Sequence, residues 1–201
     1  GGAGADFLTN TATGANASAG DILTGGDGFD TFTLIGSSAS AANYNGGPNI
    51  TDFTVGTSAT NTDFLRLSSN NADYGAGLSV DGTAAGASGT VGVLNIAQSA
   101  GATAGTDAAT EFVKLTTGVA FNTNTQTTFN DAIGTSTVTT LSTGTYAASY
   151  YDTTNSKMVI LEVATADATL GTGDTVRLIG TIDMTSSDYA NFDADNFANF
   201  L

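Results

Sequence analysis

Two nine-residue segments near the start of the chain carry glycines and an aspartate at the same positions. GGAGADFLT occupies residues 1–9 and GGDGFDTFT occupies residues 25–33. Glycines permit the positive φ angles of a tight turn and let backbone carbonyl groups approach closely. An aspartate in such a turn adds a negative charge, and Ca²⁺ binds six to eight oxygen ligands at about 2.3–2.6 Å in irregular geometry. The repeated segment therefore predicts a calcium site.

Both copies fit the pattern G-G-x-G-x-D-x-U-x, in which U is a large apolar residue. A degraded copy, NASAGDILT at residues 16–24, keeps the aspartate and the apolar residue but lacks the glycines, and it follows a six-residue insertion. Nine-residue repeats of this form are typical of a parallel β-helix that binds calcium. The calcium-binding residues predicted from these copies are Gly2, Gly4, Asp6, Asp21, Gly26, Asp27, Gly28 and Asp30.

The repeat block resembles the RTX family of secreted calcium-binding proteins. In that fold, successive repeats lie on opposite sides of a flattened coil, and repeats two apart stack with an ion between their turns. The resemblance implies that Asp6 and Asp30 share one side, bridged by calcium, while the Asp21 copy lies opposite. The alternative is a pair of glycine-rich surface turns without an ion.

Residues 36–70 resemble the segment that closes many RTX blocks with capping strands. The matching residues lie in NITDFTVG and TDFLRLSS, although an inserted TSATN stretches the spacing. Asp52 is a further candidate calcium ligand, with an edge-strand carboxylate in water as its alternative. Arg66 stands where the family has an aspartate, which leaves open any ion bound there.

Residues 71–201 predict a β-rich region with a meander or sandwich-like sheet. Its apolar segments are short and are separated by Gly, Asn, Ser and Asp, which is the pattern of strands joined by turns. YYDTTNSKMVIL predicts a hairpin with DTTNS as its turn, and TTFNDAI at residues 127–133 predicts a short helix. The expected fold is thus mainly β, with a short parallel β-roll (1–35), its capping strands (36–70) and a β-rich C-terminal region (71–201). A soft boundary is expected near residues 71–90.

The last segment, TSSDYANFDADNFANFL, predicts one or two helical turns with Ser and Asp caps. Together with the strands before it, this tail resembles the ends of RTX proteins that leave the cell by type I secretion. The resemblance implies an uncleaved export signal that includes Asp195, Phe197, Phe200 and Leu201, with Phe192 as a further aromatic candidate. The alternative is a terminal helix that packs its aromatic side chains on the sheet.

Composition excludes several classes of function. Four basic residues face nineteen acidic ones, for a net charge of −15, which disfavours binding to nucleic acid and to anionic membranes. The chain has no Cys and no His, so disulfides, Ser-His-Asp triads, cysteine nucleophiles and ordinary zinc sites are excluded. No apolar stretch has the length of a membrane-spanning helix, so membrane insertion is not expected. The first residue already begins a repeat, and we expect further repeats before it.

These observations lead to three hypotheses of function. The first is a non-enzymatic, calcium-dependent structural protein of the extracellular cell surface, which assembles with copies of itself into a surface layer after export by the type I secretion machinery. The second is the export and folding module of a secreted enzyme whose catalytic domain lies upstream. The third is an adhesin module that binds a partner or a sugar through Tyr146, Tyr150 and Tyr151, for which ordinary sheet packing is the alternative.

Overall fold

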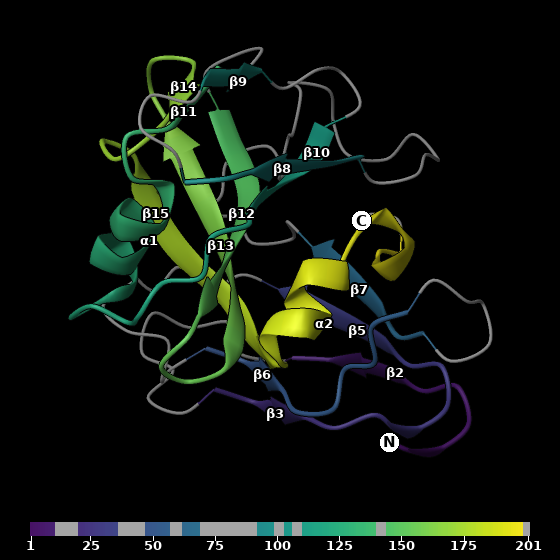
Figure 1. Cartoon of the computed structure of the whole chain (residues 1–201). Helices are drawn as coiled ribbons and strands as arrows, with labels where there is room; N and C mark the ends of the chain where they lie inside the picture. The colour runs from purple at the N-terminus through teal and green to yellow at the C-terminus, as the bar shows by residue number, and fades with distance from the viewer. Residues whose placement is uncertain are drawn as a thin grey trace.

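The computed structural model describes residues 1–10, 20–35, 47–56, 62–68, 92–98, 103–105, 110–139 and 144–198. These residues form a mainly β structure with two α-helices and one 3₁₀ turn, which confirms the expected class (Figure 1). The predicted boundary near residues 71–90 lies outside the described residues.

The strands of the first 68 residues are short, and all of them pair in parallel. They are β1 (Gly2–Ala3), β2 (Phe7–Thr9), β3 (Ile22–Leu23), β4 (Gly26–Asp27), β5 (Thr31–Ile35), β6 (Asn49–Ile50) and β7 (Phe64–Ser68). β1 pairs with β4. Figure 1 shows β2, β5 and β7, in which β2 and β7 flank β5, and also β3 and β6, which pair with each other. In the middle ladder, the apolar residues Leu8, Phe32 and Leu65 stand side by side. Since strand side chains alternate in direction, this register places the U position of each copy in one column.

Seven strands form the largest sheet, in the order β3-β6-β15-β13-β12-β10-β8. The members not yet introduced are β8 (Gly92–Ile96), β10 (Thr110–Leu115), β12 (Gly144–Asp152), β13 (Lys157–Thr165) and β15 (Thr175–Asp183). β12 and β13 form the predicted hairpin, and β15 continues the antiparallel pairing. The remaining pairs are parallel, so the sheet is mixed rather than a simple meander. Residues 158–163 of β13 are all buried, which means that both faces of the sheet are covered.

Smaller elements complete the described structure. A three-stranded sheet contains β9 (Thr103–Gly105), β11 (Thr137–Thr139) and β14 (Thr169–Leu170). The helical elements are α1 (Thr125–Ile133), α2 (Ser186–Asn191) and the 3₁₀ turn η3 (Ala194–Asn196). The predicted helix at residues 127–133 is thus α1, which begins two residues earlier because the Asn124 side chain accepts a hydrogen bond from the amide of Thr127. No helix in the described part of the chain is long and apolar enough to cross a membrane.

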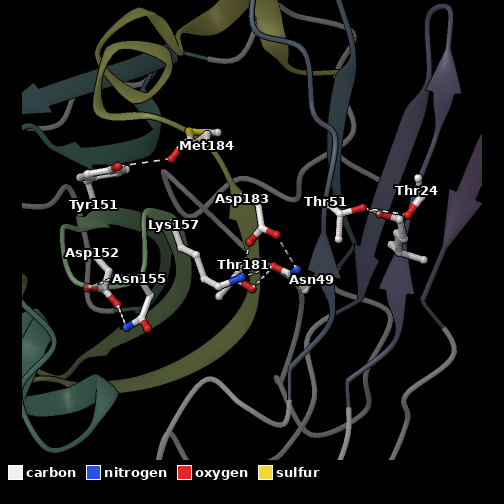
Figure 2. A network of polar contacts seen from close by, with 11 residues as sticks. Thr24, Asn49, Thr51, Tyr151, Asp152, Asn155, Lys157, Thr181, Asp183 and Met184 are labelled. Atoms are coloured by element: carbon white, nitrogen blue, oxygen red, sulfur yellow. Dashed lines mark hydrogen bonds and ion pairs between the residues drawn. The ribbon is translucent and has the colours of Figure 1, made fainter.

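A polar network fixes the junction between β6 and β15. Lys157 forms an ion pair with Asp183 and also donates to the side-chain oxygen of Asn49 at 3.0 Å (Figure 2). The same oxygen of Asn49 accepts from the hydroxyl of Thr181 at 2.7 Å. These contacts fix β6, from the N-terminal strands, at a defined register on the antiparallel part of the sheet.

Aromatic side chains from three parts of the chain share one core. Phe53 lies 5.9 Å from Phe32 and 5.8 Å from Phe192, measured between ring centroids. Phe197 lies 4.9 Å from Phe112 of β10 and 5.2 Å from Phe192. The C-terminal segment therefore packs against both the N-terminal strands and the large sheet.

Candidate metal centre

The two glycine-rich copies form two turns that lie one above the other. We call residues 1–6 and 25–30 the glycine turns. Gly2 pairs with Gly26, Ala3 pairs with Asp27, and the amide of Gly4 donates to the carbonyl of Asp27 at 2.7 Å. Residues that are 24 positions apart in the sequence, such as Gly2 and Gly26, are therefore direct neighbours in adjacent turns.

Glycine is required in the second turn on steric grounds. Gly26 has φ +100° and Gly28 has φ +138°, which side-chain-bearing residues rarely adopt. A Cβ on Gly26 would lie 2.1 Å from the carbonyl oxygen of Gly2, and one on Gly28 would lie 2.1 Å from that of Gly4. The carbonyl oxygens of the first turn therefore approach the backbone of the second as closely as glycine allows.

Three aspartates stack in register at the ends of these turns. Asp6, Asp30 and Asp63 each immediately precede one strand of the β2-β5-β7 ladder. The amide of Asp6 donates to Oδ1 of Asp30 at 2.9 Å, and the amide of Asp30 donates to Oδ1 of Asp63 at 2.8 Å. We call this column the aspartate ladder. It brings Asp6 and Asp30 to the same side, as the resemblance to RTX repeats implied.

One oxygen of the aspartate ladder differs from the others. Oδ2 of Asp6 accepts the amide of Gly2 at 2.7 Å, and Oδ2 of Asp63 accepts the amide of Thr54 at 2.7 Å. Oδ2 of Asp30 is buried and has no hydrogen-bond partner within the described residues, and the residue is only 1% exposed. A buried polar oxygen without a donor is costly, and such a group in a folded protein calls for an explanation such as a bound ion.

Asp52 contacts the second glycine turn directly. Its carboxylate accepts the amides of Gly25 at 3.0 Å and of Gly26 at 2.8 Å. The hydroxyls of Thr24 and Thr51 share a hydrogen bond of 2.8 Å beside it. Asp52 is therefore half-buried and bound to backbone amides rather than free in water, and its role as a calcium ligand stays a prediction.

The remaining predicted ligands lie elsewhere. Asp21 precedes β3, and its carbonyl accepts the amide of Asn49, so it belongs to the β3-β6 ladder and not to the aspartate ladder. The side chain of Asp27 is exposed. Within the described ranges, no three Asp, Glu, His or Cys side chains gather closely enough to hold a metal ion.

Asp63 was not among the residues predicted to bind a metal, although it is a member of the aspartate ladder. It is 2% exposed, and burial raises the pKa of its carboxyl against the two amides that stabilise its charge. The signal was present in the sequence, because Asp63 precedes Leu65 by two residues as Asp6 precedes Leu8 and Asp30 precedes Phe32.

The predicted export residues fall partly in the core. Phe197 is buried and bridges to Leu65 of β7, and the amide of Ala198 donates to the carbonyl of Leu65 at 2.9 Å. Asp195 is exposed at the 3₁₀ turn. Phe200 and Leu201 lie outside the described residues. The aromatic packing of this segment is observed, and its role in export stays a prediction.

A buried carboxyl lies far from the glycine turns, on β13. Glu162 is buried, and its nearest basic group is Arg177 on β15, with 3.9 Å between the two side chains. Burial raises the pKa of Glu162 to about 7, and the guanidinium of Arg177 only partly opposes this.

Comparisons with protein-family models, with curated proteins and with solved structures gave no match.

Proposed function

We propose that this chain is a calcium-dependent structural protein of the cell surface, in which residues 1–68 form a short β-roll of the RTX type. The observation that supports the proposal most is Oδ2 of Asp30, a buried carboxylate oxygen beside the stacked glycine turns that has no donor in the described part of the chain. A bound cation is the partner that such an oxygen lacks. The parallel pairing of all strands in this part of the chain also fits a roll.

Calcium would be held by Asp30 together with backbone oxygens of the glycine turns, with Asp6 beside it in the aspartate ladder. Because the described structure gathers few carboxylates at one point, most ligands would come from the backbone. The ion would supply positive charge to a column of like-charged carboxyls that repel one another. Calcium is scarce inside cells and plentiful outside, so ion binding would favour folding only after export.

Self-assembly is supported by two exposed apolar side chains on the N-terminal strands. Phe7 on β2 is 78% exposed and Ile22 on β3 is 74% exposed, and within the described residues these are the two most exposed large apolar side chains. Exposed apolar side chains of this size can take part in contacts with another chain. We propose a second copy of this chain as that partner.

Sedimentation velocity in calcium and in EGTA tests this proposal. The wild-type chain is expected to form large assemblies in calcium that EGTA dissolves, and Phe7→Asp is expected to prevent them without unfolding the chain. Gly173→Asp is the matched control, because Gly173 is exposed and a Cβ there meets nothing within 4 Å. A chain that folds with calcium but stays a monomer would favour the export and folding module of a secreted enzyme instead.

A further inference from the structure

A cavity of about 560 Å³ lies between α2 and the strands β8, β10 and β12. Its size falls in the range of small-molecule sites, which is about 300–1,000 Å³. The residues on which the argument depends are Asn95, Lys114, Tyr151, Thr153, Ser186 and Tyr189, and we call the space they line the tyrosine cavity. We propose that the tyrosine cavity binds a neutral saccharide, with one pyranose unit inside it. The inference is independent of calcium binding and of assembly.

The base of the cavity holds a fixed ammonium group. Lys114 is 3% exposed, and its Nζ donates to the carbonyl oxygens of Ala190 at 3.0 Å and of Phe192 at 2.7 Å. The same nitrogen lies 5.0 Å from the ring centroid of Tyr189. An ammonium has three donors, so two carbonyl contacts leave one N–H that can reach a ligand hydroxyl.

Two tyrosines beside this ammonium contribute aromatic carbon rather than hydroxyl groups. The rings of Tyr151 and Tyr189 stack with 5.5 Å between centroids and an interplanar angle of 29°. The hydroxyl of Tyr189 donates to the carbonyl of Leu115 at 2.9 Å, and that of Tyr151 donates to the carbonyl of Met184 at 3.3 Å (Figure 2). Tyr151 is 6% exposed and Tyr189 is 3% exposed, and since both hydroxyls are already engaged, the part of each ring that reaches the cavity is aromatic carbon.

At its rim, the cavity has one amide and two hydroxyl groups for a ligand, since the third aliphatic hydroxyl of its lining, on Thr116, already donates to the carbonyl of Ile96 at 3.2 Å. Asn95 on β8, Thr153 after β12 and Ser186 at the start of α2 are all exposed. Asn95 offers both donors and an acceptor, and the two hydroxyls can act as either. The three groups come from three separate segments of the chain, so each can contribute a polar contact to a ligand independently.

The ammonium, the aromatic carbon and the polar groups of the tyrosine cavity together favour one class of ligand. No carboxylate lines the cavity, which disfavours cations, and the net charge of −15 repels polyanions such as nucleotides. A pyranose presents several hydroxyls for amide, hydroxyl and ammonium groups, and its C–H face suits aromatic carbon. The sequence pointed to Tyr146, Tyr150 and Tyr151 for sugar binding, but Tyr146 and Tyr150 are completely buried. Among those three, only Tyr151 lines the tyrosine cavity.

Saturation-transfer NMR on the whole chain tests the proposal with glucose, galactose, mannose, rhamnose and N-acetylglucosamine as probes. At least one of these sugars is expected to receive saturation from the protein with a Kd of about 1 mM or tighter. The double variant Asn95→Ala, Ser186→Ala is expected to weaken binding about tenfold or more. Ser187→Ala is the matched control, because Ser187 is the exposed neighbour of Ser186 on α2 but does not line the cavity.

A filling variant, Ala190→Phe, is expected to abolish binding, because Ala190 is exposed at the wall of the cavity. Its far-ultraviolet circular dichroism shows whether it remains folded, and if it does not, the double rim variant decides. The proposal is overturned if no sugar in the panel binds, or if the rim variant binds as tightly as the wild type. Binding that is confined to glucuronate, tested in parallel, would overturn the neutral class of ligand.

Discussion

Replacing Asp30 by asparagine should have opposite effects on stability with and without calcium. The side chain is buried, and among the residues that the structure describes only its Oδ1 has a hydrogen-bond donor, the amide of Asp6. In EGTA the substitution replaces a buried carboxylate, one oxygen of which has no donor within the described residues, by a neutral amide, so the variant is expected to be as stable as the wild type or more stable. In calcium the wild type gains the free energy of ion binding, and the variant loses most of that gain.

The size of the gain follows from mass action. A free calcium concentration about 100 times the Kd stabilises the folded chain by about 2.7 kcal/mol. For a domain of about 150–250 residues, 1 kcal/mol shifts the midpoint of thermal unfolding by about 2–4 °C. Calcium should therefore raise the wild-type midpoint by about 5–10 °C. The midpoint of Asp30→Asn should move by only a small fraction of that amount.

Thermal unfolding followed by circular dichroism, in calcium and in EGTA, measures both effects. Asp195→Asn is the matched control, since Asp195 is exposed on the 3₁₀ turn and its replacement should leave the calcium shift unchanged. Equal calcium shifts in the wild type and in Asp30→Asn would refute the assignment of Asp30 as a ligand. An Asp30→Asn variant that is clearly less stable than the wild type in EGTA would refute the argument from the unpartnered oxygen.

Three further predictions concern the rest of the fold. The wild type is expected to lose stability as pH rises from about 4.5 to about 7. In this range the folded chain holds a proton on Glu162 that the unfolded chain has already released. At about 1.4 kcal/mol per pH unit, the free energy of unfolding falls by about 3 kcal/mol. Urea unfolding across this range should show a flatter profile for Glu162→Gln, and an unchanged slope would contradict the buried carboxyl. Phe192→Ala should lower the free energy of unfolding by about 3–5 kcal/mol, because the ring of Phe192 is buried. Phe7→Ala in the monomeric chain should lower it by less than about 0.5 kcal/mol, because the ring of Phe7 is exposed. Equal losses of stability in chemical denaturation would argue against the observed core. Gly26→Ala should destabilise the chain by about 1–3 kcal/mol, because Gly26 has a positive φ and its new Cβ would clash with the carbonyl of Gly2. Gly2→Ala should destabilise the chain less, because a Cβ on Gly2 meets open space. Calorimetry that finds the two variants equally stable would count against the stacked turns.

The local elements of this fold were predictable because their signals lie within a few residues of one another. The hairpin of β12 and β13 follows from two apolar strands around DTTNS, and α1 follows from TTFNDAI. The parallel pairings were not predictable in the same way. β6 pairs with β15 although more than 100 residues separate them, and this contact depends on Asn49 and Lys157 meeting across that distance. Local periodicity has no information about such partners.

In the candidate metal centre, too, some features were predictable from the sequence and others depend on contacts between distant segments. The resemblance to RTX repeats implied that Asp6 and Asp30 lie on one side, and the amide of Asp6 does donate to the carboxylate of Asp30 there. Asp63 was missed because the glycines of the repeat are absent before it, although the D-x-U spacing persists. Asp52 was recognised, but its contact with the amides of Gly25 and Gly26 depends on how adjacent turns stack.

The tyrosine cavity lies beyond sequence reasoning for a further reason. Lys114 on β10 reaches carbonyl oxygens 76 and 78 residues away, at the end of α2. The packing of α2 on the sheet depends on Tyr189, whose hydroxyl contacts both Ser149 and Leu115. Each of these residues is ordinary in its own segment, and only the packed structure brings them around one space.

The most direct test of the central claim is a calorimetric titration of the EGTA-treated and dialysed chain with Ca²⁺, with Mg²⁺ as the control ion. The account predicts saturable calcium binding that is weaker or absent for Mg²⁺ and that Asp30→Asn removes or strongly weakens. Circular dichroism on the same samples should show β structure increasing as the site fills. A chain that has the same β content in EGTA, and that takes up no calcium at millimolar concentrations, would contradict the account.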